Sequence, residues 1–185
     1  RASPAAQPGG GHGLLDLDRR HPDRLPKALV SPRGLVGGNV QRGAVSEALL
    51  IVQESRGWVS DEGVADVAEA LGMSVDEVDG IATFYDLIYR RPVGRHVIMV
   101  CDSVSCWVTG EEGILGHLQS RLGVELGGTT ADGEFTLLPV GCLGACDAGP
   151  ALMVDGELFD NLTPARADEI IARYRNGKHG TTSHG

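Results

Sequence analysis

HVIMVCDSVSC, the sequence of residues 96–106, joins a short apolar run to two cysteines. Residues 96–101 are mostly apolar and rich in β-branched side chains, a composition typical of a buried strand. The spacing Cys101-x4-Cys106 places the first cysteine at the end of this strand and the second in the segment that follows. The sequence therefore predicts a strand that leads into a loop with a pair of cysteines.

The other two cysteines follow a segment of the same kind. Residues 135–140, FTLLPV, predict a second strand, and Cys142-x3-Cys146 comes directly after it. Gly141 and Gly144 lie on either side of Cys142, and residues without a Cβ let backbone N–H groups turn toward sulfur. The chain therefore presents its cysteines as two pairs, each on a predicted loop after a strand.

Two cysteine pairs on neighbouring loops match the ligand demand of a [2Fe–2S] cluster. Each tetrahedral iron of such a cluster needs two protein ligands besides the bridging sulfides, and thiolate is the usual donor. We expect Cys101 and Cys106 on one iron and Cys142 and Cys146 on the other. Zinc also binds four thiolates at comparable spacings, so a zinc-stabilised interaction module remains an alternative. A dithiol oxidoreductase would need a C-x-x-C motif, and this sequence has none.

The remaining segments of this region alternate between strand and helix signals. We expect a helix that Gly123 terminates, a strand at residues 151–154, a turn at Asp155-Gly156 into a strand at residues 157–159, and a last helix that Thr163 caps. The order strand, helix, strand, strand, strand, helix is typical of a small α/β fold of the thioredoxin-like kind. We assign residues 92–175 to this domain.

The region before Pro92 is predicted to be a small helical bundle, residues 41–91. Apolar residues at helical spacing follow Val45, Ser60 precedes a second helix, and Ser74 with Glu77 fits a capping box at the start of a third. We expect Tyr85 on the apolar face of the third helix and interpret the bundle as a docking domain. Residues 1–40 predict a disordered or extended arm and residues 176–185 a flexible tail.

Charge and hydropathy exclude several classes of function. The formal net charge of −9 argues against nucleic-acid binding, and we expect the arginines at positions 90, 91 and 95 to be solvated or to contact an acidic partner. No apolar stretch approaches the ~20 residues that span a bilayer, so direct membrane insertion is not expected. There is no signal-peptide pattern and no G-x-G-x-x-G or P-loop motif. We therefore expect a cytoplasmic chain that does not bind NADH itself.

Four motifs together resemble one known family. ATFY at residues 82–85, PVGRHVI at 92–98, CDSVSC at 101–106 and TLLPVGCLGACD at 136–147 are similar to the thioredoxin-like [2Fe–2S] subunit of bacterial NADH:quinone oxidoreductase. This enzyme is respiratory complex I, and the resemblance is to its E-type subunit. The resemblance covers about Val45 to Tyr174 and leaves out the N-terminal arm.

The resemblance implies a function for the chain. Cys101, Cys106, Cys142 and Cys146 would ligate one [2Fe–2S] cluster, which exchanges electrons with the flavin of a neighbouring subunit. FMN and NADH would be bound by that partner, beside further peripheral-arm subunits, at the inner face of the plasma membrane. The chain alone would not be catalytic. The same module occurs in NAD-linked formate dehydrogenases and hydrogenases, which are the alternative within redox enzymes.

Overall fold

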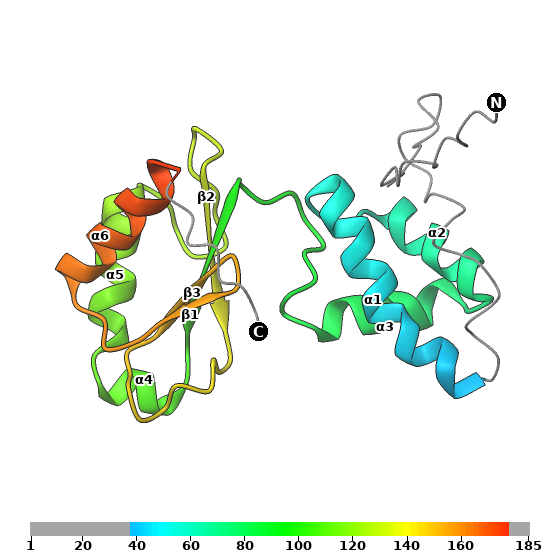
Figure 1. Ribbon diagram of the computed structural model, residues 1–185, viewed down its shortest axis with the longest axis horizontal. Helices are drawn as coiled ribbons and strands as arrows, with labels where there is room; N and C mark the ends of the chain where they lie inside the picture. The colour runs from blue at the N-terminus through cyan, green and yellow to red at the C-terminus, as the bar shows by residue number, and fades with distance from the viewer. Residues whose placement is uncertain (1–37, 178–185) are drawn as a thin grey trace, which may run out of the picture. The chain divides into compact units, whose positions relative to one another are not determined.

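The computed structural model describes residues 38–177, with side chains from residue 43 onward (Figure 1). The chain divides into two compact units, with the boundary between Arg91 and Pro92. The first unit is helical and the second is α/β. Most of the predicted arm and tail lies outside the described residues. Within residues 38–177, no helix has both the length and the apolar character needed to cross a membrane.

The helical unit consists of α1 (Gly38–Arg56), α2 (Asp61–Leu71) and α3 (Val75–Phe84). The Ser60 side chain caps α2, and Ser74 and Glu77 form the predicted capping box at the start of α3. α1 begins upstream of Val45, where the sequence has no apolar stripe to predict a helix. The three helices pack around one core: Val45, Leu49, Val52, Val59, Val64, Val67, Ala68, Leu71, Val78, Ala82 and Ile88.

The end of α3 differs from the sequence prediction. The helix stops at Phe84, and Tyr85 has an extended backbone, so Tyr85 leaves the helical spacing that placed it on the apolar face. Tyr85 is 48% exposed and Phe84 is 78% exposed, and their rings meet edge to face with centroids 5.2 Å apart. The prediction that Tyr85 belongs to the core is therefore wrong. Both aromatic side chains lie largely on the surface of the helical unit.

The segment after α3 is bound closely to the other helices. The Gln53 side chain donates a hydrogen bond to the Leu87 carbonyl (2.8 Å) and accepts one from the Tyr89 N–H (2.6 Å). The Val59 N–H donates to the Tyr89 carbonyl at 2.7 Å. Because both ends of this segment are held by α1 and its following turn, the helical unit extends as far as residue 90.

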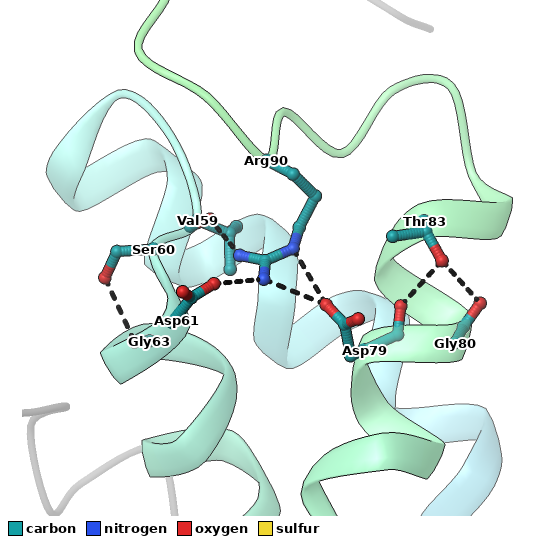
Figure 2. A network of polar contacts seen from close by, with 8 residues as sticks. All are labelled: Val59, Ser60, Asp61, Gly63, Asp79, Gly80, Thr83 and Arg90. Carbon is teal, nitrogen blue, oxygen red and sulfur yellow. Dashed lines mark hydrogen bonds and ion pairs between the residues drawn. The ribbon is translucent and has the colours of Figure 1, made fainter.

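Arg90 completes this attachment (Figure 2). Its guanidinium donates to the Val59 carbonyl and pairs with Asp61 at 2.7 Å and Asp79 at 2.9 Å. The Arg90 side chain is only 20% exposed, so the prediction that it is solvated is wrong. Its partners lie at the start of α2 and within α3, and charge patterning along the sequence could not reveal them.

We expect Arg90→Ala to destabilise the helical unit by about 1–2 kcal/mol, because it leaves the Val59 carbonyl and Asp79 without their donor. Asp61 is 94% exposed, so its pairing adds little to this value. The measurement is chemical denaturation followed by Trp58 fluorescence. Arg91→Ala is the matched control, since Arg91 is exposed and should change stability by less than about 0.5 kcal/mol. Equal effects of the two substitutions would contradict the role given to Arg90.

The α/β unit contains a four-stranded mixed sheet of order β2-β1-β3-β4. The strands are β1 (His96–Cys101), β2 (Phe135–Val140), β3 (Leu152–Val154) and β4 (Glu157–Phe159). β1 and β2 are parallel, whereas β3 runs antiparallel to both β1 and β4. All four strands lie where the sequence predicts them, with β3 shorter by one residue at its start.

Two long helices cover one face of this sheet. α5 (Glu111–Leu122) and α6 (Pro164–Arg175) lie side by side against it (Figure 1). The predicted end of α5 at Gly123 and the predicted start of α6 at Thr163 are confirmed. The core between the layers consists of Ile98, Val100, Ile114, Leu118, Phe135, Leu137, Leu152, Val154, Phe159, Leu162, Ala167, Ile170, Ile171 and Tyr174. This packing fixes the sheet edge from which the cysteines emerge.

Candidate metal centre

The parallel pairing of β1 and β2 brings the two cysteine segments to the same sheet edge. Cys101, the last residue of β1, is in register with Val140, the last residue of β2. The Asp102 N–H donates to the Val140 carbonyl at 2.8 Å, and the Cys101 N–H donates to the Ala151 carbonyl at 3.1 Å. The first of these bonds joins the two segments just before Cys142, and the second joins Cys101 to the residue that precedes β3.

The first cysteine pair differs from prediction in one respect. Cys106 lies not in a loop but in α4 (Val104–Val108), a helix that Ser103 caps by accepting a hydrogen bond from the Cys106 N–H. A five-residue helix is too short for a periodic apolar pattern, which explains why the sequence did not predict it. The N-cap preference of Ser103 was the available signal. Cys101 and Cys106 are both buried.

The second pair is exposed and closely spaced. The Sγ atoms of Cys142 and Cys146 are 3.8 Å apart. A tetrahedral metal ion with metal–sulfur bonds of about 2.3 Å holds two thiolates about 3.8 Å apart, so this spacing fits two ligands of one metal. Gly144 has φ +82° and donates its N–H to Cys142 Sγ at 3.3 Å. The turn therefore orients a backbone donor toward sulfur, as the glycine suggested.

The two pairs are neighbours. Leu143 and Ala145, from the second cysteine loop, pack against a small buried cluster that contains Cys101 and Cys106. Among the residues described, no three or more His, Cys, Asp or Glu side chains surround a single metal position. Because the second cysteine loop packs on the cluster that contains Cys101 and Cys106, the four cysteines form two adjoining pairs, an arrangement that fits a centre with two metals.

The surroundings of Cys101 and Cys106 shift the pKa values of their thiols in opposite directions. Burial raises the pKa of Cys101, but the Ser103 hydroxyl, the Leu143 N–H and Cys106 together outweigh burial and hold this pKa below its usual value. Burial and the contact with Cys101 raise the pKa of Cys106. The contact with Cys142 likewise raises the pKa of Cys146. Because metals bind thiolates, loading this site must release the protons that the metal-free thiols retain.

Gly149 lines the site for a reason that the sequence did not reveal. A Cβ at this position would lie 2.6 Å from Thr109 Oγ1 and 3.4 Å from Cys106 Sγ. A side chain at position 149 would therefore collide with the Thr109 hydroxyl, next to the first cysteine pair.

Comparisons with known proteins agree with this geometry. The model of the family described as thioredoxin-like [2Fe–2S] ferredoxin matches residues 37–175. The chain belongs to this family. The thioredoxin-like fold and the single [2Fe–2S] cluster that the sequence predicts are confirmed, and the family description specifies this cluster rather than zinc.

Several curated relatives share about half of their residues with this chain. The E-type subunit of NADH-quinone oxidoreductase from Pseudomonas aeruginosa is 50% identical over 133 residues, which are 72% of this chain and 80% of the relative. Its counterpart from Escherichia coli is 49% identical over 134 residues, 72% of this chain and 81% of the relative. The predicted family resemblance is therefore confirmed.

A solved structure also resembles the chain. The NAD+-reducing [NiFe]-hydrogenase in its air-oxidized state aligns with a TM-score of 0.61 and 24% identity. The alignment covers 72% of this chain but only 23% of the hydrogenase chain. At this identity the similarity concerns the fold alone.

Proposed function

We propose that the chain is the electron-transfer subunit of an NADH:quinone oxidoreductase and holds one [2Fe–2S] cluster on Cys101, Cys106, Cys142 and Cys146. The observation that carries this proposal is the meeting of two cysteine pairs at one sheet edge. The relatives named as E-type subunits of NADH-quinone oxidoreductase support the choice of enzyme. These relatives favour complex I over the alternative of a formate dehydrogenase or hydrogenase.

When bound, the cluster supplies a site for one electron at a time. The chain's own groups stabilise negative charge on sulfur: the Ser103 hydroxyl lies 3.4 Å from Cys101 Sγ, and the Gly144 N–H donates to Cys142 Sγ. Cys101 and Cys106 are buried, whereas Cys142 and Cys146 are exposed. One side of the site is thus shielded by the protein, and the other remains open toward a partner.

The partner in this proposal is the subunit that carries FMN and oxidises NADH, and the cluster exchanges electrons with its flavin. The helical unit, proposed as a docking domain over residues 41–91, supports such an assembly because Phe84 and Tyr85 are exposed on it. Further peripheral-arm subunits would lie nearby, and the assembly would be cytoplasmic at the inner face of the plasma membrane. The chain's net charge of −9 is consistent with contacts to proteins rather than to nucleic acid.

Electron exchange between the purified proteins tests this function. Alone, the cluster-loaded chain should neither oxidise NADH nor reduce a quinone. In stopped-flow mixing with the flavin-bearing subunit, electrons should pass in the direction set by the two potentials. Either the dithionite-reduced cluster reduces the flavin, or the NADH-reduced flavin reduces the cluster. Failure to observe transfer in both mixing orders would contradict the proposal, as would NADH oxidation by the flavin-free chain.

A further inference from the structure

A cavity of about 350 Å³ lies beside the cysteine site in the α/β unit. It is lined by none of the four cysteines, although Asp102 and Trp107, the residues that follow Cys101 and Cys106, both reach it. Its apolar walls are Val100, Leu115, Leu126 and Pro139. The cavity is therefore a separate feature next to the proposed cluster.

Three carboxylate side chains also line this cavity: Asp102, Glu111 and Glu112. Asp102 and Glu112 are exposed, but Glu111 is only 4% exposed. Within the described part of the chain, no hydrogen bond or ion pair is found for the Glu111 carboxylate. Glu111 is thus a largely buried acidic residue whose carboxylate opens into the cavity and has no hydrogen-bond partner among the described residues.

The surroundings of Glu111 disfavour the ionised form of its carboxyl group. Burial raises the pKa of Glu111, and the nearby negative charges of Asp102 and Glu112 raise it further. A carboxylate with so little access to water is stabilised by a cationic partner. A cation in the cavity would offset the burial of Glu111 and the mutual repulsion of the three carboxylates.

Helix α4, which contributes Trp107 to the cavity wall, has the features of a protein interface. Trp107 is 57% exposed, and its indole N–H donates to the Glu112 carboxylate at 3.1 Å. Val104 and Val108, also on α4, are more exposed still. Large exposed apolar side chains are typical of docking sites, and tryptophan is enriched among the residues that dominate binding energy. The same helix carries Cys106, so a partner bound here would lie next to the proposed cluster.

We propose that this cavity receives an arginine side chain from the flavin-bearing partner subunit, with Val104, Trp107 and Val108 as the apolar rim of the contact. This inference rests on the proposed function, because it names the surface through which that function's partner docks. A planar guanidinium can pair with carboxylates and stack on an indole ring, and its alkyl stem suits the apolar walls. One arginine-bearing partner surface would then contact both the acidic groups of the cavity and the exposed side chains of α4.

The test measures the affinity of the full-length, cluster-loaded chain for the flavin-bearing subunit by titration calorimetry. Glu111→Gln should raise Kd roughly tenfold to hundredfold, because it removes the buried charge that the arginine would pair with. Binding of the unaltered chain should weaken between about 50 mM and about 300 mM NaCl, and the variant should show less of this dependence. Glu169→Gln, an identical change at an exposed position of α6 outside the cavity, is the matched control and should leave Kd unchanged.

The visible spectrum of each variant shows first that fold and cluster are intact. An unchanged Kd for Glu111→Gln would overturn the inference while leaving the proposed function in place. The inference would also be overturned if the control Glu169→Gln weakened binding of the flavin-bearing subunit as much as Glu111→Gln does. A change in the oligomeric state of the isolated Glu111→Gln chain would assign the cavity to a second copy instead of the partner. Absence of a cluster, or of any complex with the flavin-bearing subunit, would instead refute the proposed function.

Discussion

Cys142→Ser is expected to remove most of the bound iron from the purified chain. Cys142 and Cys146 stand at the separation of two ligands on one metal, and a serine hydroxyl is a poor replacement for a thiolate. Because metal binding contributes to folding free energy, the α/β unit should also unfold at a lower temperature. Iron analysis and thermal unfolding of the anaerobically purified variant measure both effects.

Two further variants test whether the loss of iron in Cys142→Ser comes from loss of a metal ligand. Asp147→Asn changes an exposed neighbour in the same loop and should retain its iron. Cys142→Ser combined with Cys146→Ser should lose little more than either single variant, since both residues would serve the same metal and their effects would not add. Full iron content in Cys142→Ser, or loss of iron in Asp147→Asn, would show that the proposed ligand assignment is wrong.

Removal of residues 1–91 is expected to leave a fragment that still holds the cluster but binds the flavin-bearing subunit at least about tenfold more weakly. The remaining α/β unit contains all four cysteines and a core of its own. Its first residues are attached to the sheet, since Gly94 N–H donates to Thr136 Oγ1 at 2.6 Å and Arg95 N–H donates to the Gly133 carbonyl at 2.9 Å. Iron content and titration calorimetry with the partner are the two measurements.

Substitution of the exposed residues Phe84 and Tyr85 tests whether weaker binding reflects a lost contact with the partner or a general loss of stability. In the full-length chain, Phe84→Ala with Tyr85→Ala should reduce partner affinity without altering iron content, because both rings lie mostly outside the helical core. A fragment that binds the partner with unchanged affinity would place the interface on the α/β unit alone. A fragment unable to hold iron would show that the two units fold as one.

Local signals explain why so much of the fold was predictable. Ser60, Ser74 and Thr163 cap helices through hydrogen bonds to residues three positions along, so a short window of sequence contains both partners. The run that forms β1 and the spacing of the cysteines are equally local. The sequence therefore predicted the strands, most helices and the candidate ligands.

The features that sequence reasoning missed depend on contacts between distant segments. Arg90 pairs with acidic residues from α2 and α3, and Gly149 is constrained by side chains of residues 106 and 109. α4 lacked a pattern because it is shorter than two helical turns. Glu111 looked like an ordinary acidic residue in the first turn of a helix, and only the folded structure shows that it is buried beside a cavity.

Analysis of the iron and sulfide bound to the purified chain tests the proposed [2Fe–2S] cluster most directly. The chain, purified without oxygen, should contain about two irons and two acid-labile sulfides, and dithionite should bleach its visible bands and produce a paramagnetic signal. This result is expected because two cysteine pairs meet at one sheet edge in a member of the thioredoxin-like [2Fe–2S] family. One zinc ion per chain with no labile sulfide would contradict it.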